Sequence, residues 1–193
     1  MANVFLTSVN IREDLVHPSR LSHYHPTSRS LPLVKAVMTP GATMAIASYG
    51  SGKSLAAGVG ALAILNDGFA RSHLSKLADR MRGIDGQAAA MIDERLTSGK
   101  RGKVVVLAGY VSDPAEQIRA ALGIESRASV RSIAAAIRRG EIEGVDHVAI
   151  VWDEFGRHLE SLVRDARAKD LEIVQDLAEL AVRSETVGLS LTC

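Results

Sequence analysis

The sequence has only one cysteine in 193 residues, and this is Cys193, the last residue. One cysteine cannot form a disulfide framework within the chain, so we expect a reducing compartment, the cytoplasm. The N-terminal residues meet charges at Arg12, Glu13 and Asp14. They contain no apolar core followed by a small-residue cleavage site, so they are not typical of a secretory signal.

Long apolar runs and an excess of charge of one sign are also missing. The most apolar stretch, around residues 55–65, is rich in Ala and Gly and falls short of the roughly 18 to 20 residues that cross a bilayer. Lys and Arg number 23 against 22 Asp and Glu, a net charge of +1. We therefore expect no membrane partner, and the net charge gives no support to nucleic acid as a partner.

The first 40 residues differ in composition from the rest. Between Val16 and Pro40 the chain is rich in Pro, Ser, His and Thr without sustained periodicity, which is typical of an irregular segment. We therefore expect an irregular lead-in over residues 1–40 and a single core over residues 41–193. Within the core, helical spacing near residues 70–100, broken at Gly83 and Gly86, predicts a helical insertion.

Four apolar segments predict the strands of the core. They lie near residues 42–47, 103–110, 147–152 and 187–192. The second, KVVVLAGY, is a continuous β-branched run of the kind that a parallel strand buried on both faces requires. Segments of helical spacing separate the strands, and Asp113-Pro114 opens one of them as an N-cap followed by proline. This alternation predicts an α/β fold of three layers with a mostly parallel sheet.

The segment ASYGSGKS, Ala47–Ser54, follows the first predicted strand and precedes a helix. It matches the phosphate-loop pattern G-x-x-x-x-G-K-[ST] except at its first position, which is Ala47. In such a loop backbone N–H groups converge on phosphates, the lysine reaches the β- and γ-phosphates, and the hydroxyl ligates Mg²⁺. The alternative is a Gly-rich turn that carries a lysine by chance. The predicted nucleotide-binding residues are Ser48, Tyr49, Gly50, Ser51, Gly52, Lys53, Ser54 and Leu55.

The segment HVAIVWDEFG is an apolar strand that ends in Asp153 and Glu154. Ligands of open α/β sheets bind at the carboxyl ends of the strands, so these carboxylates are expected beside the loop. We predict that Asp153 and Ser54 organise Mg²⁺, that Glu154 polarises the attacking water, and that Lys53 acts with it in catalysis on ATP. The alternative is the solvated end of a strand. Trp152 points to the opposite face and is expected in the core.

Together the two motifs resemble the Walker A and Walker B motifs of P-loop NTPases of the additional-strand, AAA-like class. The resemblance implies a sheet of order 5-1-4-3-2, in which the strand at 187–192 lies between the two motif-bearing strands. Thr192 or the residue after Cys193 would then be the sensor. No fifth strand follows, so we expect the sheet to be incomplete at the C-terminus. Either the lead-in covers the edge of the first strand, or the chain is part of a longer one.

The segments IASYGSGKS and IVWDEFGRHLE, with the lead-in HPSRLSHYHPTSRS, resemble the N-terminal ATPase region of large bacterial phage-defence ATPases. This resemblance implies Mg²⁺-dependent ATP hydrolysis as the motor or switch of a homo-oligomer or larger protein complex. No arginine finger, lid or effector domain is identifiable in the sequence. A non-catalytic nucleotide-binding or interaction module is therefore the alternative, and a kinase-like transferase fits less well because the Asp-Glu pair suits water activation.

Three further sets of residues fit ordinary structure better than function. The histidines lack a neighbouring cluster of zinc-ligand spacing, the pair after Glu154 is typical of a polar helix face, and acidic neighbours dilute the arginines. The sets are His17, His23 and His25; Arg157 and His158; and Arg127, Arg131, Arg138 and Arg139.

Overall fold

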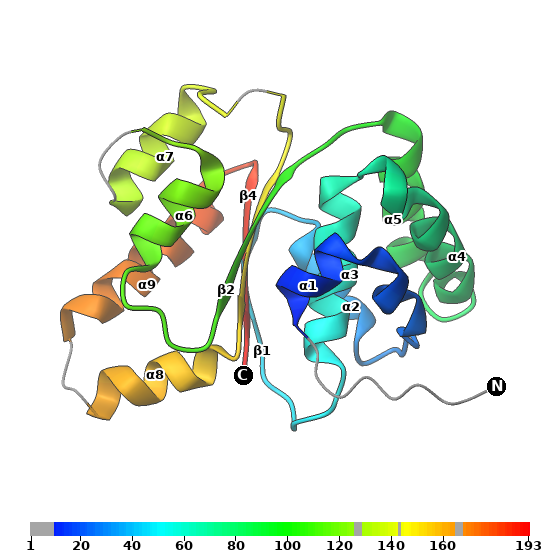
Figure 1. The fold of residues 1–193 in the computed structure, drawn as a ribbon, viewed down its shortest axis with the longest axis horizontal. Coiled ribbons are helices and arrows are strands. Elements are labelled where there is room, and N and C mark those ends of the chain that lie inside the picture. The colour runs from blue at the N-terminus through cyan, green and yellow to red at the C-terminus, as the bar shows by residue number, and fades with distance from the viewer. Residues whose placement is uncertain (1–9, 126–128, 143, 165–167) are drawn as a thin grey trace.

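The computed structural model describes residues 10–125, 129–142, 144–164 and 168–193. Its centre is a sheet of four parallel strands in the order β1-β4-β3-β2, seen edge-on in Figure 1. The strands are β1 (Gly41–Ala45), β2 (Lys103–Ala108), β3 (Val148–Asp153) and β4 (Val187–Thr192). The predicted α/β class and parallel sheet are confirmed, and β4 lies between β1 and β3, as expected for the segment at 187–192.

Helices cover both faces of the sheet (Figure 1). On one face lie α1 (Ile11–Val16), α2 (Leu31–Val37), α3 (Lys53–Leu65), α4 (Arg71–Arg82) and α5 (Gly86–Ser98), with short 3₁₀ turns η1 (Pro18–His23) and η2 (Gly68–Ala70). The other face carries α6 (Pro114–Leu122), α7 (Val130–Arg138), α8 (Phe155–Arg164) and α9 (Ala168–Arg183). Among the described residues, none of these helices combines the length and the apolar character needed to cross a bilayer.

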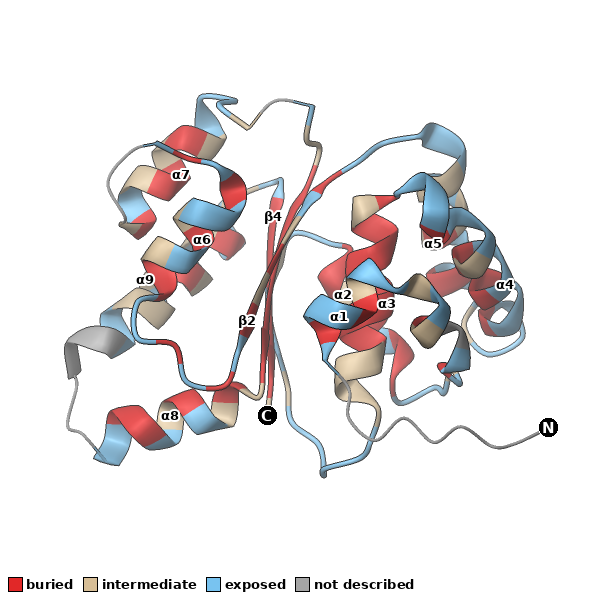
Figure 2. Ribbon diagram, in the orientation of Figure 1, coloured by how far each residue is buried: buried red, intermediate tan, exposed pale blue. Residues whose placement is uncertain are grey.

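The strand β3 is buried along its whole length because helices pack on both of its faces (Figure 2). Its side chains alternate between two cores, as the geometry of a strand requires. Ala149 and Val151 belong to the core beneath α3, whereas Ile150 and Trp152 belong to the core beneath α6 and α9. The expected core position of Trp152 is confirmed, and the same alternation directs Asp153 toward α3.

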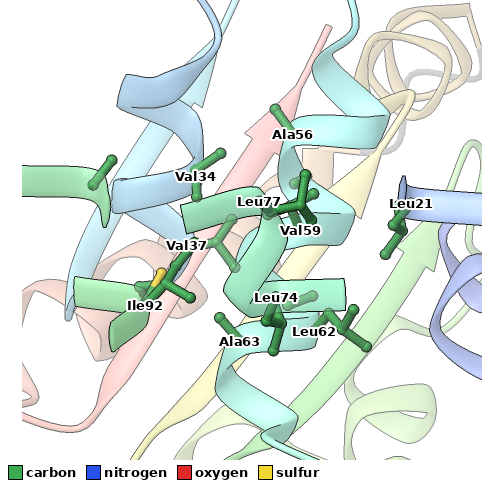
Figure 3. Close-up of a cluster of buried hydrophobic side chains, with 14 of the residues drawn as sticks. Leu21, Val34, Val37, Ala56, Val59, Leu62, Ala63, Leu74, Leu77 and Ile92 are labelled. Carbon is green, nitrogen blue, oxygen red and sulfur yellow. The ribbon is translucent and has the colours of Figure 1, made fainter. Parts of the chain in front are cut away.

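The helix α3 is the centre of the first core. It is rich in Ala and Gly, and every residue from Ala56 to Ile64 is buried. Larger side chains from α2, α4, α5 and η1 surround it, among them Val34, Leu74 and Ile92 (Figure 3). A Cβ at Gly60 would lie 2.8 Å from the Val34 carbonyl oxygen, so only glycine permits α2 to pack this closely.

The lead-in is not irregular over its described residues, and that prediction is wrong. Residues 10–40 form α1, η1 and α2, and Leu21, Tyr24 and Leu31 are buried in the same core as α3. The Tyr24 and Ser30 hydroxyls lie 2.5 Å apart and join the turn to α2. Elements this short show too few periods to be recognised in sequence, because they are stabilised by burial against distant residues. The domain boundary at residue 40 stays a prediction.

The insertion near residues 70–100 consists of α4 and α5, as predicted. The break between them follows from local chemistry, because Gly83 ends α4 and the Asp85 carboxylate accepts hydrogen bonds from the backbone N–H groups of Gln87 and Ala88. An ion pair of 2.7 Å between Lys35 Nζ and Asp85 Oδ2 joins the insertion to α2. The insertion therefore packs on the helices of the first face.

The lead-in covers part of one edge of the sheet. The Arg12 guanidinium donates to the Val106 carbonyl oxygen from Nη2 at 2.7 Å and from Nε at 3.1 Å. This contact covers β2, whereas the expected site of coverage was the edge at β1. In the described part of the chain β4 is the only strand that pairs with β1, and Met44 in β1 is 47% exposed.

His147 generates a prediction about the pH dependence of stability. Its side chain is 2% exposed, its Nε2 lies 3.2 Å from the Val37 carbonyl oxygen, and burial lowers its pKa from the usual 6.5. The unfolded chain therefore binds a proton here more readily, so this residue lowers the free energy of unfolding as the pH falls below about 6.5. We expect His147→Asn to lose less stability than the parent between pH 7.5 and 5.5 in urea unfolding. Equal losses in the two proteins would contradict this account.

Candidate functional site

The Gly-rich loop, defined as residues 46–52, connects β1 to α3 and is mostly exposed. Gly50 and Gly52 have φ of 77° and 84°, values that residues with a side chain rarely adopt. A Cβ at either position would meet no atom within 4 Å, so glycine is required here by the backbone angle. Gly52 is the N-cap of α3, and the loop therefore delivers the unpaired N–H groups of the first helical turn to solvent.

The Lys53 side chain turns back across this loop. Its ammonium donates to the carbonyl oxygens of Ala47 at 2.6 Å and Ser48 at 2.9 Å, and to Ser51 Oγ at 3.3 Å. A cation in the first turn of a helix adds to the positive end of the helix dipole, an arrangement that disfavours folding. The same arrangement concentrates positive potential at one point, which suits an anion.

Three side chains from different elements meet beside the loop. Asp153 Oδ1, at the end of β3, accepts hydrogen bonds from Ser54 Oγ at 3.0 Å and from Thr192 Oγ1 at 2.5 Å. The backbone N–H of Glu154 donates to the same oxygen at 3.1 Å. Asp153 is 7% exposed and Thr192 1%. The structure thus joins α3, β3 and β4 at one carboxylate, across 99 residues in the case of Ser54.

Glu154 has a strained backbone. Its φ is +52°, and among the described residues only Asn66 shares a positive φ without being glycine. Such a conformation costs about 1–3 kcal/mol and is concentrated at functional sites. The Glu154 carboxylate pairs with Arg157 at 3.1 Å, and both side chains are well exposed, so the pair adds little to stability.

Gly109, directly after β2, also lies at this edge of the sheet. It was not among the predicted site residues. Gly109, with φ of 56°, donates its N–H to the Asp153 carbonyl oxygen at 2.8 Å and accepts from Trp152 Nε1 at 3.0 Å. The available signal was the glycine directly after the β-branched run at 103–108. Gly109 lies near Glu154, because a Cβ there would be 3.9 Å from Glu154 Oε2.

His158 was expected on a polar helix face, but its side chain is buried and only 1% exposed. Its ring packs 4.4 Å from the Trp152 ring and stacks on Tyr110 at 5.7 Å between centroids. Its Nδ1 accepts from the Val111 N–H at 3.3 Å. Its neighbour Arg157 is exposed and reaches Glu154 instead. The prediction was wrong about which face of α8 carries His158, because the helix begins at Phe155, one residue after Glu154.

The predicted site residues lie in three places: the edge of the sheet, the exposed loop and, for Leu55, the first core. Lys53, Ser54, Asp153 and Glu154 share one edge of the sheet. Tyr49 is 95% exposed on the loop, with Ser48, Gly50 and Ser51 also exposed. The Leu55 side chain packs against the first core, so only its backbone is available to a ligand.

The secondary candidates remain apart from this site. Within the described ranges no group of three His, Cys, Asp or Glu side chains is arranged to hold a metal, and this includes His17, His23 and His25. Arg127 lies outside the described residues, and Arg139 pairs with Glu141 at 2.6 Å.

Comparisons with protein-family models, with the curated proteins and with the solved structures gave no match.

The buried contacts of Asp153 generate a stability prediction. Thr192→Val keeps the side-chain volume but removes the hydroxyl that donates to Asp153 and accepts from the Glu154 N–H at 3.3 Å. We expect the free energy of unfolding to fall by about 1.5–3 kcal/mol, the contribution of a hydrogen bond to a charged acceptor, although Ser54 and the Glu154 N–H still donate to Asp153.

The matched control is Ser190→Ala in the same strand. The Ser190 hydroxyl is buried and makes no hydrogen bond to any described residue, so its removal should change the free energy of unfolding far less. Denaturant unfolding of both variants checks this difference. Equal losses would show that the Thr192 hydrogen bond to Asp153 adds nothing to the free energy of unfolding.

Proposed function

We propose that the chain binds ATP with Mg²⁺ at the Gly-rich loop and hydrolyses it, as the nucleotide-driven part of a larger assembly. The observation that carries the proposal is the contact of 3.0 Å between Ser54 and Asp153, next to the lysine-bearing loop. A hydroxyl from the first turn of a helix and a carboxylate from the end of a parallel strand are the pair that a P-loop enzyme uses to hold Mg²⁺.

The phosphates would bind at the loop and at the first turn of α3. Backbone N–H groups there face solvent, and Gly50 and Gly52 leave open space around the backbone. The Lys53 ammonium now donates to two carbonyl oxygens, and phosphate oxygens would replace some of those contacts with charge-assisted ones. Binding would therefore turn an unfavourable charge at the helix start into a favourable one.

The oxygen donors present suit Mg²⁺. Mg²⁺ is a hard cation that is bound by one or two protein oxygens together with phosphate and water, so a larger protein cage is not required. Ser54 and Asp153 would hold it, and the ion would neutralise charge on the phosphates. Thr192 and the Glu154 N–H keep the Asp153 carboxylate oriented while it does so.

Glu154 would accept the proton of the attacking water. Its left-handed backbone separates its side chain from that of Asp153, so the two adjacent carboxylates can serve different roles. A place in a bacterial phage-defence complex rests on the motif resemblance alone and is part of the same proposal.

One observation favours a second candidate function, a nucleotide-binding switch without turnover. The Glu154 carboxylate lies 3.1 Å from the Arg157 guanidinium, so an exposed ion pair competes with its action as a base. A chain that kept this pair would bind nucleotide and change shape or partners without releasing phosphate.

Lys53→Ala tests binding. Removing the cation should weaken ATP·Mg²⁺ binding at least tenfold, because hydrogen bonds to charged groups contribute about 1.5–3 kcal/mol. The measurement is the rise in melting temperature with ATP, GTP and Mg²⁺. Lys103→Ala, an exposed lysine at the start of β2, is the control and should keep the full shift. No shift in the parent chain with either nucleotide would refute the proposal.

Glu154→Gln tests hydrolysis. The amide keeps the size of the side chain but cannot accept the proton, so phosphate release should fall about 10²- to 10⁴-fold while the nucleotide-induced thermal shift persists. Phosphate release at the parental rate in this variant would show that Glu154 is not the base. A parent chain that binds ATP but releases no phosphate identifies the switch instead.

A further inference from the structure

The chain leaves β2 through a short exit segment, residues 109–111, which two buried side chains hold in place. Trp152 Nε1 donates to the Gly109 carbonyl oxygen at 3.0 Å, and His158 Nδ1 accepts from the Val111 N–H at 3.3 Å. Trp152 lies in β3 and His158 in α8, which runs beside the segment (Figure 1). The exit segment is therefore held by one donor that cannot titrate and by one acceptor that can.

The hydrogen bond from Val111 requires a neutral His158. A neutral imidazole has one nitrogen that can accept a hydrogen bond, and here that nitrogen is Nδ1, whereas an imidazolium carries N–H groups on both nitrogens. Protonation therefore sets the Nδ1–H against the Val111 N–H. Both residues are buried, with 1% and 3% of their surface exposed, so water does not replace the lost contact in place.

The other neighbours of His158 tolerate a charge. Its ring centroid lies 4.4 Å from that of Trp152, 5.7 Å from that of Tyr110 and 6.0 Å from that of Phe155. Aromatic rings attract cations, so a protonated imidazole is able to stay among them. The contact that protonation removes is the one to the Val111 backbone.

We propose that His158 is a pH-sensitive latch, which holds the exit segment when neutral and releases it when protonated. The segment borders the candidate site, because a Cβ at Gly109 would lie 3.9 Å from Glu154 Oε2 and from Arg157 Cδ. Acid therefore loosens the β2 side of that site. The latch is a property of the chain without nucleotide, so it does not depend on the proposed ATP binding.

Other charged and titratable groups lie on the elements that contact His158 or adjoin it. They are Tyr110 and Asp113 after β2, Asp153 at the end of β3, and Glu154, Arg157, Glu160 and Arg164 at the start of α8 or within it. All of them remain in the variants that test the latch. A difference between those variants and the parent therefore isolates the titration of His158.

Two substitutions separate the acceptor of His158 from its ring. In His158→Asn the side-chain carbonyl oxygen takes about the place of Nδ1 and accepts at every pH, whereas His158→Phe keeps a ring without an acceptor. The measurement is hydrogen exchange of the Val111 amide, corrected for the intrinsic effect of pH. At pH 7.5 this amide should exchange about tenfold faster in His158→Phe than in the parent, because one buried hydrogen bond is lost.

Lowering the pH to 5.5 should remove a similar factor of protection from Val111 in the parent, and His158→Asn should keep its protection. The Ile150 amide, in the buried strand β3, is the internal control for global opening and should not follow Val111. Equal protection of Val111 at the two pH values in the parent would overturn the proposal.

Fluorescence tests the protonation itself. Trp152 is the only tryptophan of the chain, and its ring contacts that of His158. Because a protonated imidazole quenches indole emission more strongly than a neutral one, the emission of the parent should fall between pH 8 and 5. It should stay constant in both His158 variants and fall as in the parent in His147→Asn. A constant emission in the parent, or a fall that persists in His158→Asn, would overturn the proposal.

Discussion

One carboxylate oxygen, Oδ1 of Asp153, accepts hydrogen bonds from the Ser54 hydroxyl, the Thr192 hydroxyl and the Glu154 N–H. These donors belong to the start of α3, the end of β4 and the residue after β3. The contact is available only because β4 lies between β1 and β3, which brings the loop after β1 and the end of β3 to opposite sides of Thr192. The strand order therefore places the loop near Glu154, and a single buried acceptor joins the two.

Several unfavourable local features gather at this same edge of the sheet. Glu154 has a left-handed backbone, Lys53 adds its charge to the positive end of a helix, and Tyr49 is almost fully exposed. The first two lower stability, whereas helices elsewhere begin with ordinary caps, as at Asp85 and Asp113. Departures of this kind are expected where a site is retained for its chemistry rather than for folding.

Much of the fold could be predicted from the sequence, because β2 and β3 are continuous apolar runs and α6 begins with a recognisable cap. The meeting of Ser54 with Asp153 could be expected too, since carboxyl ends of parallel strands share one edge. The lead-in could not be predicted. Leu21 is buried against α3, where a Cβ at Gly58 would lie 3.2 Å from it, and no local pattern encodes such a contact. The burial of His158 depends on where α8 starts, which periodicity leaves open by several residues.

The contact between Arg12 and Val106 spans 94 residues and has a consequence for the order of folding. During synthesis the lead-in emerges first, yet the strand that it caps is completed only after α3, α4 and α5 have been made. Domains fold largely as they leave the ribosome, at about 5–20 residues per second, so the cap on β2 forms several seconds after Arg12 appears. Because β2 pairs with β3 and β1 pairs with β4, no strand pair of the sheet can form before β3 has been made, and the nascent chain is most exposed to wrong strand pairing until then.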